Sequence, residues 1–166
     1  MGRLGKYGMT EYYKGKLEAG LEYQDFIADQ LRKADPCIIL GAYSSRKFQN
    51  ERGESASGIE IKHDMRLKET GNLYIEVAEK SHPDIPDYTP SGIFRNDNTW
   101  LYLIGDYDEA FLFSKHQLRT IYADEKNWQQ RGIQKKQTQT SIGFIYPVWS
   151  ALKGMCLTQF IFSKGY

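Results

Sequence analysis

Apolar and charged positions alternate along two segments in the middle of the chain. Residues 59–64 are Ile-Glu-Ile-Lys-His-Asp, and residues 73–80 are Leu-Tyr-Ile-Glu-Val-Ala-Glu-Lys. A period of two is typical of a β-strand with one buried face. The stretch between them ends in the turn-forming residues 70–72, Thr-Gly-Asn. The pattern therefore predicts two neighbouring antiparallel strands.

The alternation also predicts which side chains share a face of these strands. Ile59 and Ile61 would lie on one face, and the charged residues of both strands would lie on the other. Any register that keeps the apolar faces together brings Glu76 close to Glu60 and Lys62. We therefore expect Glu60, Lys62 and Glu76 on one open sheet face. The two predicted faces consist of Ile59, Ile61, Leu73, Ile75 and Val77 on one side, and Glu60, Lys62, Asp64, Tyr74, Glu76, Ala78 and Lys80 on the other.

The remaining pattern predicts an α/β fold. Helical spacing of apolar residues predicts helices over 17–33, after Ser114, and over 148–153, while apolar runs predict strands at 37–43, 100–106, 109–114 and near the C-terminus. The segment 81–99 contains three prolines and is expected to be irregular, and 129–143 is a polar connector without a clear state. We expect a mixed central β-sheet of about five strands flanked by helices.

Composition sets further bounds on this prediction. A chain of 166 residues suits a single domain spanning 1–166, with residues 1–16 expected to be flexible. Its net charge is only +1, so a DNA-binding face would have to come from local clustering. The 23 aromatic residues (12 Tyr, 8 Phe and 3 Trp) favour core packing over base stacking. Two cysteines in apolar runs and the lack of a membrane-length apolar stretch indicate a cytoplasmic protein with no membrane contact.

The charged positions include a pair with possible catalytic chemistry. Glu60 and Lys62 are two residues apart, so on a strand they share a face. A hard divalent cation prefers oxygen ligands, and it can polarise a phosphoryl group and lower the pKa of a bound water. A neighbouring ammonium group could orient that water. Alternating charge on an exposed strand is nevertheless common and is the ordinary explanation of such a pair.

Longer stretches around this pair carry a resemblance. The runs "GESASGIEIKHD", "TGNLYIEVAEK" and "PSGIFRNDNTWLYLIGDY" are similar to a family of small phage and prophage proteins. That family resembles the PD-(D/E)XK, or restriction-endonuclease-like, nucleases, which include Holliday-junction resolvases. The match covers about residues 50–120, and the helix before "CIILG" also fits the opening of that fold. The resemblance implies a restriction-endonuclease-like fold and a Mg²⁺- or Mn²⁺-dependent enzyme that acts on DNA.

Carried over residue by residue, the resemblance implies that Glu60 and Lys62 are the Glu and Lys of the (D/E)XK pair. The first acid of the motif would be Glu54 or, less well, Glu51. The opening helix would contribute Glu22. The implied catalytic residues are then Glu60, Lys62, Glu54 and Glu22, and the implied metal ligands are Glu54, Glu60, Asp64 and Glu76. An alternative placement uses Asp64 and Glu76 as the two acids, with Lys80 in place of a lysine at Ala78.

Three functions follow from these observations. The favoured one is a metal-dependent DNA endonuclease, structure-specific or resolvase-like, which could work as a homodimer. The alternative is a nuclease-fold protein of a phage or mobile element that binds DNA or protein without catalysis, since fold alone does not determine activity. The third is an interaction protein with a large exposed apolar surface. Whether Glu54 approaches Glu60 separates the first two.

Overall fold

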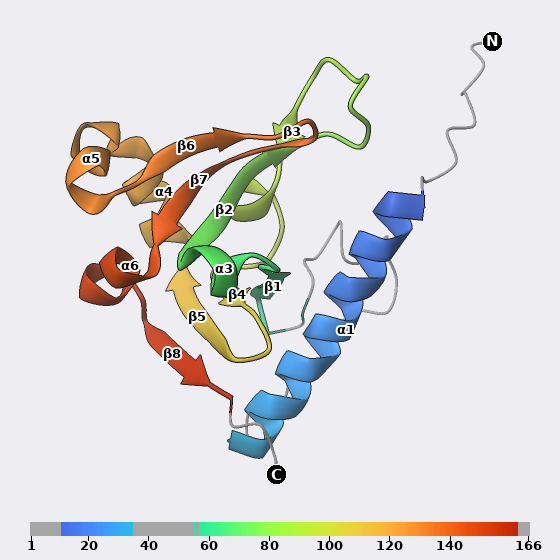
Figure 1. Ribbon diagram of the computed structural model, residues 1–166, viewed down its shortest axis with the longest axis vertical. Coiled ribbons are helices and arrows are strands. Elements are labelled where there is room, and N and C mark those ends of the chain that lie inside the picture. Colours follow the sequence, from blue (N-terminus) through green and yellow to red (C-terminus); the bar gives the residue numbers. More distant parts are fainter. Residues whose placement is uncertain (1–10, 35–54, 56, 163–166) are drawn as a thin grey trace.

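The fold is mixed α/β, with two mostly antiparallel β-sheets flanked by helices (Figure 1). The computed structural model describes residues 11–34, 55 and 57–162. The first sheet has the strand order β1-β4-β5-β8, and the second has the order β3-β2-β7-β6. The strands are β1 (Ile59–His63), β2 (Asn72–Glu79), β3 (Thr89–Pro90), β4 (Leu101–Gly105), β5 (Glu109–Ser114), β6 (Gln134–Gln137), β7 (Ser141–Pro147) and β8 (Thr158–Ile161).

The helices lie between and beside these strands. α1 precedes the first sheet in sequence, α4 follows β5 directly, and short helical turns occupy several connections. The helical elements are α1 (Glu11–Ala34), α3 (Leu67–Thr70), η1 (Gly92–Phe94), α4 (Lys115–Ala123), η2 (Glu125–Asn127), α5 (Trp128–Arg131) and α6 (Val148–Gly154). None of the helices in the described part of the chain has both the length and the apolar character needed to span a membrane.

The first sheet is mixed because β1 and β4 are parallel. Their register pairs Glu60 with Tyr102, while β4 pairs with β5, and β5 with β8, in the antiparallel direction. Parallel neighbours need a long crossover connection. Here the crossover contains β2 and β3, which join β7 and β6 to form the second sheet. The connection from β1 to β4 therefore links the two sheets.

This topology corrects the predicted pairing of the two alternating segments. β1 and β2 lie in different sheets, so the expected antiparallel pair is wrong, and so is the single central sheet. The residues between them do not form a tight hairpin, because they coil into α3 and bury Leu67. The predicted common apolar face is also wrong. Ile59 and Ile61 pack in one core, whereas Leu73, Ile75 and Val77 pack in another.

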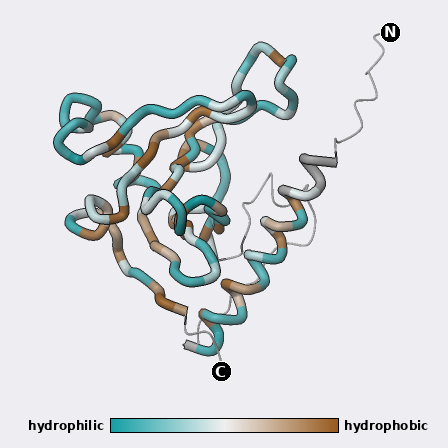
Figure 2. The backbone as a smooth tube through the Cα atoms, in the orientation of Figure 1, coloured by the Kyte–Doolittle hydropathy of each residue, from teal (hydrophilic) through white to brown (hydrophobic). Residues whose placement is uncertain are grey.

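The first core lies between α1 and the first sheet. Tyr23, Ile27 and Leu31 recur at helical spacing and pack against Ile59 and Ile61 of β1. Brown apolar segments alternate with teal polar ones along this helix (Figure 2). The helix predicted over 17–33 is thus confirmed and begins earlier, at Glu11, so residues 11–16 are helical rather than flexible.

The second core lies between the two sheets. β4 is buried on both faces: Leu101 and Leu103 face α1, while Tyr102 and Ile104 join the second core. A strand covered on both sides needs a continuous apolar run, which "LYLI" supplies. The second core also includes Phe111 and Phe113 of β5, Phe144 and Tyr146 of β7, and Leu118 and Ile121 of α4.

Several other predicted elements are confirmed. The hairpin of β4 and β5, the helix after Ser114, the short helix at 148–153 and the last strand all form. The polar connector 129–143 contains the edge strand β6. The strand predicted at 37–43 lies outside the described residues.

Exposed apolar side chains gather near the end of the described chain. Trp149 and Leu152 of α6, Leu157, and Ile161 of β8 are all large and exposed.

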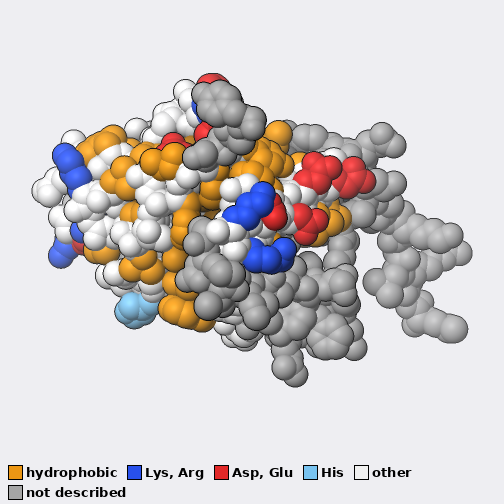
Figure 3. All heavy atoms as spheres, turned by 90° about the horizontal axis from the view of Figure 1, so that it is seen from below, with side chains coloured by type: hydrophobic (Ala, Val, Ile, Leu, Met, Phe, Trp, Pro, Cys, Tyr) orange, Lys and Arg blue, Asp and Glu red, His pale blue; other side chains and the backbone are white. Residues whose placement is uncertain are grey.

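In the space-filling view from below, apolar side chains cover much of the described surface, and basic groups lie beside acidic ones (Figure 3). The described part of this face therefore lacks the continuous basic surface that duplex DNA favours.

Two glycines hold left-handed turns near the ends of β2. Gly71 ends α3 with φ +64°, and a Cβ added there would meet nothing within 4 Å. Gly92 opens η1 with φ +51°, and a Cβ there would collide with the Glu76 backbone carbonyl. A side chain at either position would strain the left-handed backbone, but only at Gly92 would it also collide with a neighbouring strand.

We expect Gly71→Ala to lower the free energy of unfolding by about 1 kcal/mol, because only the left-handed backbone is strained. Gly92→Ala should lower it by about 2 kcal/mol more, since the methyl group also displaces β2 from the loop. Urea unfolding of the two variants measures the difference. Equal losses would show that the loop does not pack against β2 as described.

Candidate functional site

Glu60 is the centre of a buried charge cluster. Its side chain is 0% exposed and points from β1 toward the space between the sheets, beside Tyr102. The Lys115 ammonium lies 2.5 Å from Oε2, and the Lys62 ammonium lies 3.1 Å from Oε1. Arg95 Nη2 lies 3.5 Å from Oε1. Both carboxylate oxygens therefore face cations.

Lys115 is the most buried of these cations. It is the first residue of α4, directly after β5, and its side chain is 1% exposed. Its ammonium donates hydrogen bonds to the Gly92 carbonyl at 2.9 Å and to the Thr99 hydroxyl. The ammonium therefore combines these two hydrogen bonds with the ion pair to Glu60, and its side chain is almost completely buried. Lys115 thus connects β1 to the loop 91–99.

Asp97 completes the cluster from that loop. Its Oδ1 accepts hydrogen bonds from the Thr99 backbone at 2.9 Å and the Thr99 hydroxyl at 2.5 Å. Asp97 also lies 3.7 Å from the Lys115 ammonium and 3.9 Å from Arg95 Nε. The Asp-x-Thr spacing favours this local turn. We call Glu60, Lys62, Arg95, Asp97 and Lys115 the buried charge cluster.

The electrostatics of the cluster keep Glu60 ionised. Burial raises the pKa of the Glu60 carboxyl, but the nearby Lys62, Lys115 and Arg95 charges outweigh that effect and hold the pKa below its ordinary value. The pKa of the neighbouring Tyr102 phenol is raised, mainly by burial and further by the Glu60 charge. The site is therefore a fixed carboxylate in a cationic surrounding, next to a neutral tyrosine.

Glu76 lies in the second sheet and has different partners. Its Oε1 accepts a hydrogen bond from the Ser91 hydroxyl at 2.8 Å, and its Oε2 accepts one from the Ser141 hydroxyl at 2.9 Å. Because Ser141 has one proton to donate, the 2.7 Å contact between Ser141 and Tyr74 has the tyrosine as donor. Burial, with a smaller effect of Glu76, raises the pKa of Tyr74 to about 12 despite the Ser141 hydrogen bond.

Asp64 connects β1 to β2 through the backbone. Its Oδ1 accepts the Arg66 N–H at 3.0 Å, and its Oδ2 accepts the Tyr74 N–H at 2.8 Å. The side chain is nearly buried. Asp64 thus fixes the end of β1 against the start of β2, which is a structural role.

The structure brings together only part of the predicted site. Glu60 and Lys62 do share a face and contact each other, but the expected open face with Glu76 is wrong, because Glu76 belongs to the other sheet. Glu22 is exposed on α1, which packs against the opposite face of β1. The structure therefore does not bring Glu22 to Glu60.

Two further predicted positions can be assigned. Lys80, considered as a substitute for a lysine at position 78, donates to the Pro83 carbonyl at 2.7 Å and lies over the Tyr88 ring. The proposed first acid, Glu54 or Glu51, lies outside the described residues. The approach of Glu54 to Glu60, which would distinguish the catalytic from the non-catalytic function, therefore also lies outside them.

The described carboxylates do not fit a Mg²⁺ or Mn²⁺ ion in this arrangement. Both oxygens of Glu60 face cations, and a metal there would lie beside the Lys115 ammonium. The oxygens of Asp64 and Glu76 accept hydrogen bonds from the protein. Within the described part of the chain, no three or more His, Cys, Asp or Glu side chains are grouped as metal ligands would be.

Three members of the cluster were not predicted from the sequence. Lys115 looks like an ordinary helix residue, and Arg95 and Asp97 lie in a loop predicted only as irregular. The Asp-x-Thr spacing was the one local signal for this loop's structure. Arg95 and Lys115 contact Glu60 from distant parts of the chain, so no local sequence pattern could predict these contacts.

No protein-family model matches the chain, and no curated protein or solved structure matches it either.

The cluster predicts a large stability effect at Lys115. Lys115→Met should lower the free energy of unfolding by about 3–5 kcal/mol, because it leaves the Glu60 carboxylate buried near fewer cations. Lys153→Met on the exposed end of α6 is the matched control and should change it by less than about 0.5 kcal/mol. Urea unfolding gives both values. Similar small losses in both variants would contradict the cluster.

The lowered pKa of Glu60 also predicts a pH dependence. A carboxyl with a depressed folded-state pKa stabilises the fold above its ordinary value of 4.5, and that stabilisation is lost as the pH falls through the folded-state pKa. Glu60→Gln should therefore lose less stability than the wild type between about pH 7 and pH 3. Urea unfolding across this range measures the two slopes, and identical slopes would exclude a depressed pKa.

Proposed function

We propose that the protein is a DNA-binding module of the restriction-endonuclease-like kind that works without a preformed metal site. The observation that carries this proposal is the state of Glu60: a fully buried carboxylate whose two oxygens face Lys115, Lys62 and Arg95. A metal ligand has to present an oxygen to the ion, whereas a structural carboxylate has to be neutralised. Glu60 meets the second requirement.

The ligand class comes from the sequence resemblance and from cations near the cluster surface. The resemblance implies DNA. The Lys62 and Arg95 side chains are 27% and 19% exposed, so parts of both reach solvent while they contact Glu60. A cation held in place by a buried acid is oriented before it meets a phosphate, which lowers the entropy cost of binding.

A metal-dependent DNA endonuclease is the second candidate, and one observation favours it. Glu60 and Lys62 share one face of β1, as the spacing of a (D/E)XK pair implies, and Lys62 Nζ lies 3.1 Å from Glu60 Oε1. Mg²⁺ or Mn²⁺ would then need Glu54 to complete the ligand set. On this hypothesis Glu60→Gln would weaken metal binding, Lys62→Ala would spare it and slow cleavage, and Ca²⁺ would support DNA binding without efficient cleavage.

One experiment separates the two candidates. Purified protein is mixed with plasmid, single-stranded, flap and four-way-junction DNA, with EDTA or with Mg²⁺, Mn²⁺ or Ca²⁺, and binding and cleavage are followed on gels. We expect binding in EDTA that weakens steeply with salt, and no cleavage under any condition. Cleavage that depends on Mg²⁺ or Mn²⁺ and is lost in Glu60→Gln would establish the endonuclease instead.

The outcome in which no DNA form is bound would overturn both candidates. Lys62→Ala provides a further check on the proposed module. Removing one phosphate contact should reduce the slope of log affinity against log salt by about 0.9 on duplex DNA. An unchanged slope would mean that Lys62 does not face the DNA.

A further inference from the structure

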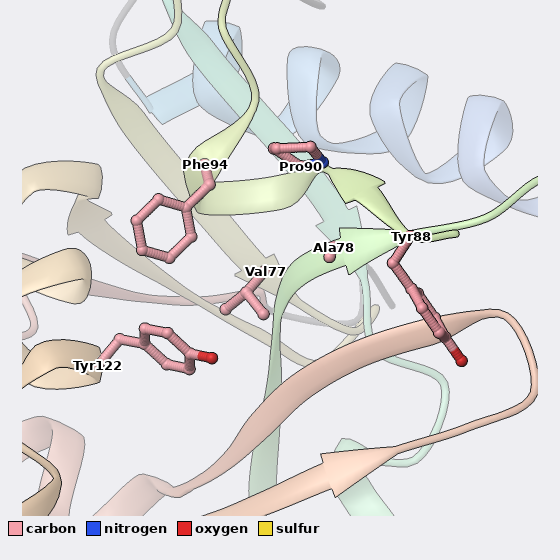
Figure 4. Close-up of a pocket in the computed structure, with 6 residues that line it drawn as sticks. All are labelled: Val77, Ala78, Tyr88, Pro90, Phe94 and Tyr122. Atoms are coloured by element: carbon pink, nitrogen blue, oxygen red, sulfur yellow. The ribbon is translucent and has the colours of Figure 1, made fainter. Parts of the chain in front are cut away.

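An open pocket of about 370 Å³ lies at the edge of the second sheet, and no residue of the buried charge cluster lines it. Its volume is within the range of about 300–1,000 Å³ that small-molecule sites occupy. All of its lining residues are apolar or aromatic, and none is charged. They are Val77, Ala78, Tyr88, Pro90, Phe94 and Tyr122 (Figure 4).

The floor of the pocket comes from β2 and β3. Ala78 pairs with Pro90, so these two side chains share a face. Lys80 directly follows β2 and Tyr88 directly precedes β3, and the Lys80 ammonium lies over the Tyr88 ring. The β2–β7 register shifts between Glu76 and Ala78, which lets Val77 and Ala78 both line the pocket. A local irregularity thus opens this end of the sheet.

The wall of the pocket comes from η1 and α4. The rings of Phe94 and Tyr122 meet edge to face, with centroids 5.5 Å apart and planes at 70°. Arg119 lies one helical turn before Tyr122, and its guanidinium is 5.8 Å from the Phe94 ring centroid. Its Nε donates a hydrogen bond to the Ile93 carbonyl at 2.6 Å. The guanidinium is therefore fixed beside the wall.

A second cation lies at the other end of the pocket. The Lys80 ammonium is 4.9 Å from the Tyr88 ring centroid. In Figure 4, Tyr88 lies on one side of the pocket, and Phe94 and Tyr122 lie on the other. The pocket thus has an uncharged aromatic interior, and a cation lies over an aromatic ring at each end.

We propose that this pocket binds one unpaired nucleotide of single-stranded DNA, with its base against the aromatic rings and its phosphates near Arg119 and Lys80. The inference rests on the proposed DNA-binding function and names the form of DNA. Base–aromatic stacking needs a ring face and no specific hydrogen bond, and the apolar lining offers just such a surface. A base inside a duplex is already stacked and cannot enter the pocket.

The charges favour a nucleotide over other flat or apolar ligands. A proline-rich peptide also docks in aromatic grooves, but it needs no cation at each end. A nucleotide combines an uncharged ring with an anionic backbone, and the pocket combines aromatic rings with two cations. The two sets of charges are complementary.

The test uses fluorescence anisotropy with a labelled oligothymidylate of about 12 nucleotides. Ala78→Leu fills the pocket while leaving every ring and cation in place, and Phe94→Leu removes one ring but keeps apolar bulk. We expect each variant to bind single-stranded DNA about tenfold more weakly than wild type. Arg119→Gln should reduce the slope of log affinity against log salt by about 0.7.

The protein itself offers a matched control. The Lys153 ammonium lies 5.2 Å from the Trp149 ring centroid on α6, which is a similar cation–ring arrangement, and neither residue lines this pocket. Trp149→Leu and Lys153→Gln should change affinity less than twofold. Thermal unfolding checks that Ala78→Leu and Phe94→Leu remain folded. Ala78→Leu fills the pocket, whereas Phe94→Leu removes one of its rings. If both variants remain folded and both lose affinity for single-stranded DNA, the pocket is supported as the binding site.

Three results would overturn the inference. If the wild type binds single-stranded DNA and both Ala78→Leu and Phe94→Leu bind it equally well, the pocket is not the binding site, although the DNA-binding function stands. Binding of duplex DNA alone would do the same. A proline-rich peptide that displaces the oligonucleotide from wild type with equal or higher affinity would assign the pocket to a peptide. If no DNA is bound at all, the proposed function fails together with the inference.

Discussion

The ion pair between Glu60 and Lys115 connects three parts of the fold that the sequence separates widely. Glu60 lies on β1 at the edge of the first sheet, Lys115 begins α4, and the same ammonium holds the loop 91–99 through the Gly92 carbonyl and Thr99. A charge buried this deeply is stable only when its partners are in place. The positions of β1, α4 and the loop are therefore mutually dependent.

The loop that follows β3 carries this dependence outward. Its successive residues contact different elements: the Ser91 hydroxyl donates to Glu76, the Gly92 carbonyl accepts from Lys115, and the Ile93 carbonyl accepts from Arg119. The next residue, Phe94, forms part of the pocket wall. One short segment thus joins the buried charge cluster to the aromatic pocket. A change in the cluster would move the pocket wall, although no cluster residue lines the pocket.

Local features of the fold could be predicted from the sequence, and pairings between distant strands could not. The alternation in β1 correctly places Ile59 and Ile61 opposite Glu60 and Lys62, because side-chain direction is a property of the strand itself. The strand that pairs with β1 could not be predicted in this way. The apolar faces of β1 and β2 suggested one shared core, but the fold has two cores, one on each side of the first sheet. Each strand's pattern satisfies either arrangement equally well.

The same distinction applies to the site. The contact of Glu60 with Lys62 follows from their spacing, whereas those with Lys115 and Arg95 depend on the path of the whole chain. From the sequence, two charges two residues apart on a strand fit either a catalytic pair or a solvent-exposed pair. Their burial in the structure indicates a third role, a structural ion pair. An apolar pair could fill this space with similar or greater stability. What an apolar pair could not do is set the position of a polar loop, because only directional partners hold carbonyl and hydroxyl groups at fixed points. The charge cluster is thus best understood as a device that orders the loop 91–99, and through it the surface at which a ligand would bind.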